Sequence, residues 1–147
     1  MGRTRRMAIV SVLALVSLVC LGMGSMGQSV KVTKVPEPDR LFTAEVVDAE
    51  DTSYTVREFS VEGLTLVPVT LGKAEVSIDF AAIRSVEFQY DEPTLAAVVT
   101  YRDGSTRKVR VEPGVNFYGR TKWGMLRLAA RDVRRVTFVQ QEATPAP

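Results

Sequence analysis

Two stretches of the sequence decide the fold, LGKAEVSIDFAAIRSVEF at residues 71–88 and TKWGMLRLAARDVRRVTF at residues 121–138. They align without a gap, and apolar side chains coincide at several positions. Four of the coinciding pairs are Ile78 with Leu128, Ile83 with Val133, Val86 with Val136 and Phe88 with Phe138. Self-similarity of this kind predicts an internal duplication, with one copy at residues 44–88 and the other at residues 97–138.

The first stretch also bears on whether these segments are strands or helices. Val76, Ile78 and Phe80 alternate with polar residues, at the period of two that a half-buried strand requires. Taken alone, the second stretch also fits an amphipathic helix with arginines on one face, and that alternative stays open. Because the copies align, we expect each to contain a strand, a short turn at residues 79–82 or 129–132, and a final strand.

Further strands are predicted at residues 54–61, 64–71, 96–102 and 105–111. Asp103 and Gly104 suit a two-residue hairpin turn, which would pair Val98 with Val109 on one face. The predicted fold class is all-β, a small barrel or β-sandwich of seven to nine strands built from two tandem β repeats. A copy of about 50 residues is near the lower limit for an independent core, so we expect the repeats to share one.

We place this β domain at residues 41–139 and expect different roles for the chain ends. Residues 1–27 are typical of a signal peptide, because arginines precede an apolar run and small residues stand before an expected cleavage at Gln28. Residues 28–40 contain two prolines and are predicted to be an extended linker, and residues 140–147 a disordered tail. We therefore expect an exported protein, periplasmic or extracellular after cleavage.

Two alternatives to this cleavage are weaker. Acylation of Cys20 would make a lipoprotein, but Ser17 and Val19 stand where lipoprotein signals usually carry leucine and a small residue. An uncleaved anchor would need about 20 apolar residues to span a bilayer, and the run at residues 7–21 is shorter. Cleavage one triplet earlier, at Gly22-Met23-Gly24, is a further option.

The composition excludes several catalytic classes. The 147 residues include no histidine and one cysteine, so Ser-His-Asp and Cys-His nucleophiles, histidine-containing zinc sites and an intramolecular disulfide are all ruled out. The acidic turn of Asp48, Glu50 and Asp51 does not have the spacing of an EF-hand, and we interpret it as a solvated turn. No feature selects a pair of carboxylates for glycoside hydrolysis. We predict no enzymatic activity, no cofactor and no metal.

Charge divides unevenly between the two copies. The whole chain carries a formal charge of +2, but residues 28–96 have six bases against thirteen acids, and residues 97–147 have ten bases against four acids. The net charges are therefore −7 and +6. This asymmetry indicates either salt-sensitive head-to-tail self-association or neutralisation within one barrel. The expected partner is an unknown envelope protein or a second copy of the chain, and nucleic acid is not expected.

The pattern V-x-I-x-F-x-x-I-x-x-V-x-F at residues 76–88 resembles the end of small SH3-like and Sm-like barrels. It is also similar to uncharacterised exported bacterial proteins with repeated I-x-x-I-x-F segments. The resemblance covers about residues 44–139 and implies a small β fold. The RNA-binding loop signature of Sm-like proteins is not found in this sequence, so no functional residue is carried over.

Aromatic and basic residues are interleaved in the second copy. The candidate interaction surface consists of Tyr118, Arg120, Lys122, Trp123, Arg127, Arg131, Arg134 and Arg135. Such a mixture can stack planar groups and attract anions, whereas packing in the core and at its rim is the alternative interpretation. We predict a structural or protein-interaction module of the bacterial cell envelope. The alternative is a module that binds anionic envelope polymers or lipid headgroups, with peripheral membrane contact.

Overall fold

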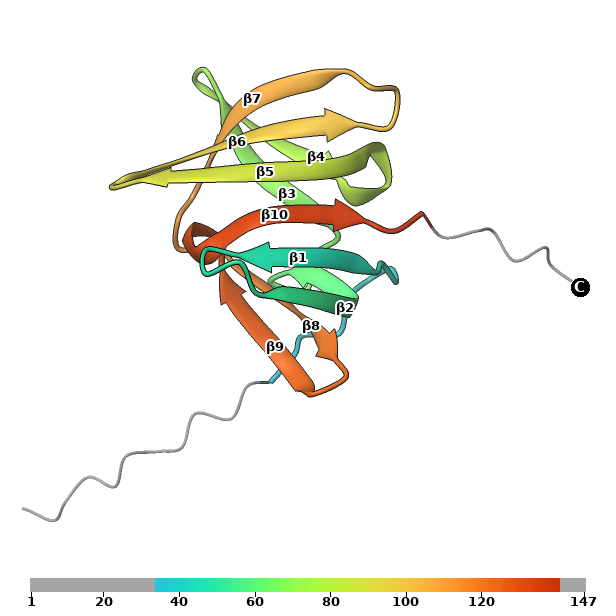
Figure 1. Ribbon diagram of the computed structural model, residues 1–147. Coiled ribbons are helices and arrows are strands. Elements are labelled where there is room, and N and C mark those ends of the chain that lie inside the picture. Colours follow the sequence, from blue (N-terminus) through green and yellow to red (C-terminus); the bar gives the residue numbers. More distant parts are fainter. Residues whose placement is uncertain (1–33, 141–147) are drawn as a thin grey trace, which may run out of the picture. The chain divides into compact units, whose positions relative to one another are not determined.

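The computed structural model describes residues 34–140, which contain ten β-strands and two single-turn 3-10 helices (Figure 1). The elements are β1 (Ala44–Asp48), β2 (Ser53–Val61), β3 (Leu66–Leu71), β4 (Ala74–Asp79), η1 (Phe80–Ala82), β5 (Ile83–Asp91), β6 (Thr94–Tyr101), β7 (Thr106–Val111), β8 (Asn116–Thr121), β9 (Gly124–Ala129), η2 (Ala130–Asp132) and β10 (Val133–Phe138). The signal peptide predicted at residues 1–27 lies outside the described residues, as does most of the predicted tail.

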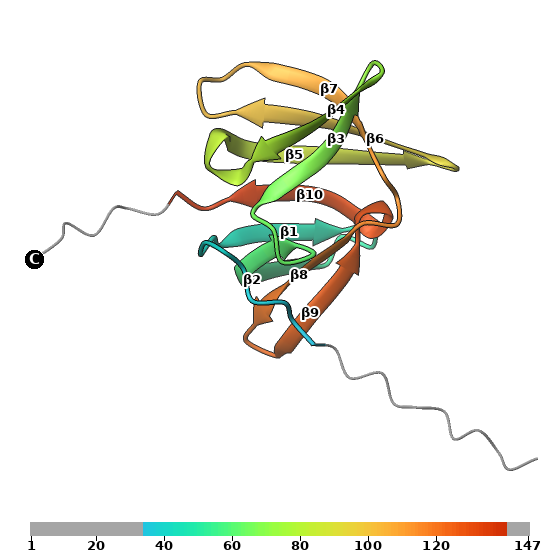
Figure 2. The ribbon, with the colours of Figure 1, turned by 180° about the vertical axis from the view of Figure 1, so that it is seen from behind.

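All ten strands belong to one antiparallel sheet in the order β4-β3-β7-β6-β5-β10-β1-β2-β8-β9. The sheet curls on itself, and the β3–β4 hairpin crosses in front of the central strands when the molecule is seen from behind (Figure 2). The all-β prediction is confirmed, with ten strands where the sequence predicted seven to nine. The helical alternative for the second copy is wrong, because residues 124–129 pair with β8 as a regular strand.

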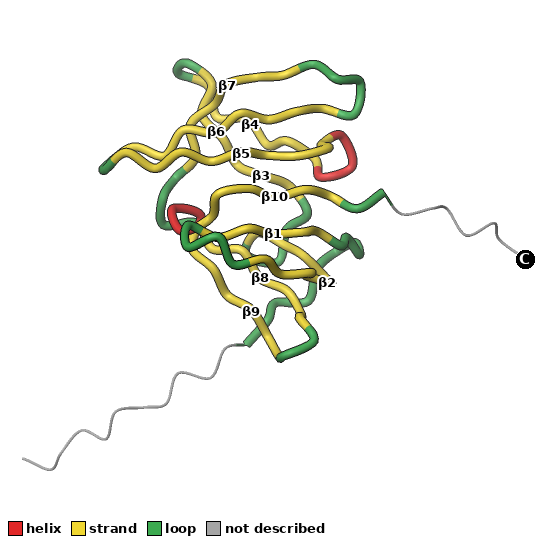
Figure 3. The backbone as a smooth tube through the Cα atoms, viewed as in Figure 1, coloured by secondary structure: helices red, strands yellow, loops and turns green. Residues whose placement is uncertain are grey.

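The two aligned stretches fold into the same succession of elements (Figure 3). Each element of the first stretch has a counterpart 50 residues later. The pairs are β3 with β8, β4 with β9, η1 with η2, and the start of β5 with β10. The hairpin β1–β2 likewise precedes the first set as the hairpin β6–β7 precedes the second. The turns expected at residues 79–82 and 129–132 are the 3-10 helices.

Strand order relates the two sets by an approximate two-fold symmetry. If each strand is replaced by its counterpart, the order reads the same from the opposite end of the sheet. The counterparts Val86 and Val136 pair directly with each other at the centre, where β5 meets β10. On each side of this pair, three strands of one set combine with two strands of the other. Neither set could form its half of the sheet alone, so the two share one core.

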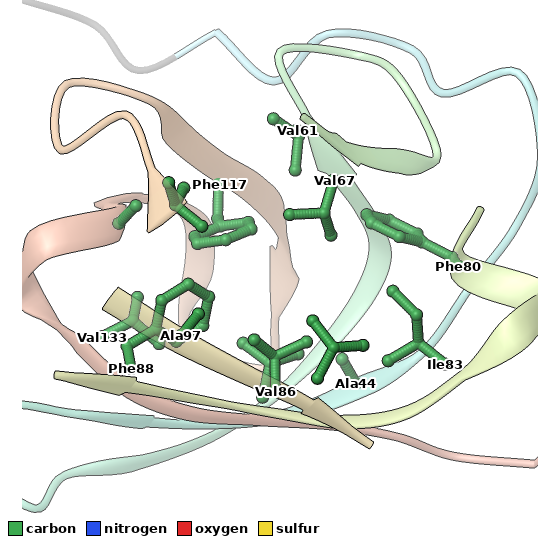
Figure 4. Packing of buried hydrophobic residues seen from close by; sticks show 14 of the residues in the cluster. Ala44, Val61, Val67, Phe80, Ile83, Val86, Phe88, Ala97, Phe117 and Val133 are labelled. Atoms are coloured by element: carbon green, nitrogen blue, oxygen red, sulfur yellow. The ribbon is translucent and has the colours of Figure 1, made fainter. Parts of the chain in front are cut away.

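Phenylalanine rings dominate that core. Phe59 stacks on Phe117 with ring centroids 5.2 Å apart, and Phe80 lies 4.7 Å from Phe138. Figure 4 shows Phe117 and Phe80 directed into the same interior as Val86 of β5. The rings come from both sets of strands. Because Phe80 is fully buried, its truncation to alanine would lower the free energy of unfolding by about 3–5 kcal/mol.

The hairpin β6–β7 differs from its predicted register by one residue. Tyr101 N–H donates to the Ser105 carbonyl at 2.8 Å, so the loop has three residues and ends on Gly104, whose φ is +88°. Val98 therefore pairs with Lys108 instead of Val109. A slip of one residue exchanges the two faces of a strand, and Val98 points outward, 40% exposed. Three-residue hairpin loops with a left-handed glycine are common alternatives to the two-residue turn.

The end of the predicted linker is attached to the domain through Asp39 and Arg40. The Asp39 carboxylate accepts from the Thr65 hydroxyl at 2.8 Å. The Arg40 guanidinium donates to the Thr65 hydroxyl at 3.0 Å and to an Asp79 carboxylate oxygen at 2.9 Å. It also lies 5.2 Å from the centre of the Phe42 ring. The chain leading into β1 is thus held against the end of β4 by at least one cation with several partners.

Candidate interaction surface

The hairpin β8–β9 displays its polar side chains on the outer face of the sheet. Tyr118 pairs with Arg127, and Arg120 pairs with Met125, whereas Phe117 and Leu128 pair on the inner face. Phe117 is buried in the core, and Tyr118 is half-buried. Each interpretation of the aromatic residues, core packing or an exposed binding surface, therefore holds for part of them. Phe117 packs in the core, and other rings lie at the surface.

The tip of this hairpin carries the most exposed large aromatic side chain among residues 34–140. Trp123 is 69% exposed, and the Lys122 ammonium lies 4.5 Å from the centre of its ring. The Tyr54 ring meets the indole edge to face at 6.4 Å. Thr121 holds the turn, because its hydroxyl accepts from the Trp123 N–H at 3.1 Å and donates to the Gly124 carbonyl at 2.9 Å. The indole itself makes no contribution to those hydrogen bonds.

An open groove of about 370 Å³ lies between this tip and the outer face of the first hairpin. Its lining residues are Glu45, Ser53, Thr55, Arg57, Lys122 and Trp123. The Thr55 hydroxyl donates to the Glu45 carboxylate at 2.9 Å. The groove thus combines one aromatic surface, two hydroxyls, two cations and one carboxylate that already has a partner.

The four groove residues that come from the first copy were not predicted from the sequence. Their signal is the alternation along β2, where residues 53, 55 and 57 are polar and exposed while Val56 is fully buried. That alternation identifies an outward face. It does not show that the tip of a hairpin 70 residues further along the chain lies beside it, because this depends on the pairing of β2 with β8.

Three of the predicted arginines contact acids of the first copy. Arg135 pairs with Glu87 at 2.9 Å, Arg134 forms an ion pair with Asp51, and Arg120 forms one with Glu58. These contacts join the basic and acidic copies within one molecule, which is one of the two outcomes that the charge asymmetry indicated. Exposed pairs of this kind contribute little each, typically about 0.2–1 kcal/mol.

The remaining predicted residues divide by location. Arg127 lies on the outer face of β9 and Arg131 lies in η2, and neither forms an ion pair within residues 34–140. The eight residues therefore form no single patch. Lys122 and Trp123 line the groove, the outer face of β8–β9 carries three others, and the rest follow η2 and β10.

Asp48 organises the acidic turn between β1 and β2. Its carboxylate accepts from the backbone N–H groups of Glu50 and Thr52, both at 2.9 Å, and from the Tyr54 hydroxyl at 3.1 Å. Slight burial raises the pKa of Asp48, but these hydrogen bonds outweigh it and hold that pKa below its ordinary value. The same bond to Asp48 raises the pKa of the Tyr54 hydroxyl. This carboxylate supports a turn, and residues 34–140 contain no cluster of three acidic or thiol ligands around it.

Asp79 has the corresponding role at η1. Its carboxylate accepts from the Ala81 N–H at 2.8 Å, and this bond, together with Arg40, lowers the pKa of Asp79. The counterpart in the second copy is Ala129, whose side chain cannot cap η2. The two copies therefore provide a natural comparison between a capped and an uncapped version of the same turn.

Comparison with known proteins identifies one family. Residues 38–142 match a family described as "Uncharacterised protein", which spans well over half of the chain and the whole of the ten-stranded sheet. No curated protein matches the sequence. Within the part of the chain that the structure describes, no helix is long and apolar enough to cross a membrane.

Proposed function

The chain belongs to that uncharacterised family, and we propose that its β domain is an exported, non-catalytic interaction module of the bacterial cell envelope. The single observation that carries the proposal is the exposed Trp123 at the tip of β8–β9. The absence of histidine from the whole sequence supports the non-catalytic part, because it removes the commonest general base. The resemblance to SH3-like and Sm-like barrels stays a prediction.

The internal repeat makes the tryptophan informative. The counterpart of Lys122-Trp123 is Gly72-Lys73, which connects β3 to β4 in a turn of the same length. The fold can therefore make this turn without an aromatic residue. Tryptophan is enriched where proteins bind partners, since it buries a large apolar surface on contact and keeps a polar N–H at its edge. We infer that Trp123 is present for a contact outside the domain.

A pull-down from envelope extract at low salt tests this proposal. We expect wild-type protein to retain a partner that Trp123→Ala loses, while both unfold at the same temperature because the indole is mostly exposed. Lys73→Ala is the matched control, since it truncates the counterpart turn in the first copy, and it should retain the partner. Equal retention by all three proteins would refute the assignment of the surface.

Export is tested separately. We expect the protein recovered from cells that express the full chain to begin at Gln28 when its intact mass is measured. A mass that includes residues 1–27 would indicate a retained anchor, and acylation at Cys20 would add the mass of lipid to a shortened chain. Either result would correct the localisation without affecting the test of Trp123.

A second candidate function is binding of an anionic envelope polymer in the groove. Arg57 and Lys122 line it together with Trp123, and Glu45 is engaged by Thr55. Cations beside an exposed ring suit an acidic sugar or a phosphorylated headgroup. Isothermal titration with an acidic polysaccharide and with anionic vesicles tests this. Arg57→Gln should abolish binding and the remote variant Arg107→Gln should not, whereas no binding by wild type would remove the candidate.

A further inference from the structure

The sheet has two free edges, and they are counterparts of each other. β4 pairs only with β3 and β9 pairs only with β8 among residues 34–140. Both ladders are regular over six residue pairs, without a bulge. Neither edge strand contains proline. Such strands present unpaired N–H and C=O groups, which natural proteins usually protect because they can recruit another strand.

The directions of the edge strands permit identical molecules to join. Ten strands that alternate in direction leave β4 and β9 antiparallel to each other at opposite ends of the sheet. A second molecule in the same orientation can therefore place its β4 beside β9 of the first and continue the antiparallel pattern. Strand addition at an edge is an established mode of recognition, in which backbone hydrogen bonds supply affinity and side chains supply specificity.

The side chains of the two edges are complementary. Glu75 lies on the outer face of β4 and Arg127 on the outer face of β9, and neither has an ion-pair partner among residues 34–140. An antiparallel register that places Glu75 opposite Arg127 also places the partly exposed Val76 opposite Leu126 on the inner face. Opposite charges across a strand pair stabilise it, and apolar pairs add to this.

The symmetric alternatives lack this match. Two β9 edges would bring arginines together, and two β4 edges would bring glutamates together, and like charges across a strand pair are destabilising. Only the head-to-tail arrangement pairs acid with base. The ion pairs already formed within the molecule leave these edge charges available.

We propose that the protein self-associates head to tail, by pairing of β4 of one copy with β9 of the next, with Glu75 opposite Arg127. The partner is a second copy of this chain, and the surface is distinct from the groove at Trp123. Heterologous contacts of this kind do not close after two molecules, so the products form a concentration-dependent series instead of a single dimer.

Sedimentation velocity at low salt tests the proposal on protein expressed as the full chain and purified as the cells process it. We expect wild type to show oligomers that grow with concentration. Glu75→Arg alone and Arg127→Glu alone should each weaken association about fivefold. The double variant, which exchanges the two charges, should restore it. Arg107→Glu is the matched control, because it makes the same charge change on an interior strand and should leave association unchanged.

The outcomes separate the alternatives. A monomeric wild type at low salt would overturn the proposal. So would single variants that associate as wild type does, or a double variant that is not restored. A stable dimer that is weakened by only one of the two substitutions would indicate a symmetric edge contact instead, and would also overturn the head-to-tail arrangement. The pull-down with Trp123→Ala is a separate experiment, so failure of self-association and failure of partner binding can be told apart.

Discussion

Substitution of Gly119 by alanine tests a close approach between β8 and β2. A Cβ atom at this position would lie 2.1 Å from a methyl carbon of Val56 and 2.8 Å from the Arg57 carbonyl oxygen. Real Cβ contacts almost never fall below 3.0 Å. Val56 is fully buried, so its methyl group has no free space to enter, and the second neighbour is backbone. The β2 strand is irregular here, since its register with β8 shifts between Arg57 and Ser60.

The magnitude follows from the number of atoms that must move. Overpacking a core position costs typically about 1–3 kcal/mol, and a clash with both a buried methyl and a backbone carbonyl belongs at the upper end. We therefore expect Gly119→Ala to lower the free energy of unfolding by about 3 kcal/mol, and the melting temperature by about 15 °C for a domain of this size. The counterpart Val69 carries a full side chain, so the constraint is specific to the second copy.

Urea unfolding followed by far-ultraviolet circular dichroism measures this effect. Gly114→Ala is the matched control, because the nearest atom to a Cβ there is 4.0 Å away and its φ is ordinary, and it should change stability by less than about 1 kcal/mol. The double variant with Val56→Ala should be less destabilised than the sum of the single variants, because the first clash is gone. Equal stability of Gly119→Ala and Gly114→Ala would refute the reasoning. So would a double variant whose destabilisation equals the sum of the Gly119→Ala and Val56→Ala effects.

Three further predictions concern the turns and the ion pairs. Asp79→Ala should lower the free energy of unfolding, measured in urea, by about 1 kcal/mol through loss of a cap. The pKa of Asp79 in the folded protein lies below the ordinary 3.8. The difference in stability from wild type should therefore be complete above about pH 5 and vanish as pH falls through the lowered pKa. Ala129→Asp should raise the melting temperature by adding the missing cap, and an unchanged value would show that η2 cannot use one. Glu87→Gln should destabilise by less than about 1 kcal/mol at low salt, with no difference from wild type in 1 M salt, because its pair with Arg135 is exposed.

Local pattern was sufficient for part of the fold. The alternation at Val76, Ile78 and Phe80 predicted a strand, and the alignment of two stretches predicted that the second would match it. The hairpin register was wrong by one residue, because Asp103-Gly104 is compatible with both a two-residue and a three-residue loop. That choice depends on which face of β6 the core accepts, and the core packs Ala97 and Val99 inward.

Only part of the candidate site could be predicted from the sequence. Aromatic and basic residues are visible in the sequence of the second copy, and Trp123 and Lys122 do lie together in a groove. Their companions Glu45, Thr55 and Arg57 come from the first copy, and nothing in their local sequence connects them to the tip of β8–β9. Likewise, the sequence showed that the copies have opposite charges, but not that Arg135 and Glu87 meet inside one molecule.

Alternation and turn residues within short segments were therefore enough to predict most of the strands and the two short turns at residues 79–82 and 129–132, but not the register of every hairpin. Which strands become neighbours depends on contacts between segments far apart in the sequence. The order places Val86 beside its own counterpart Val136 and exchanges strands between the copies, so that each half of the sheet needs both. A copy of about 50 residues is near the lower limit for burying enough apolar surface alone, and the phenylalanine core combines rings from both copies.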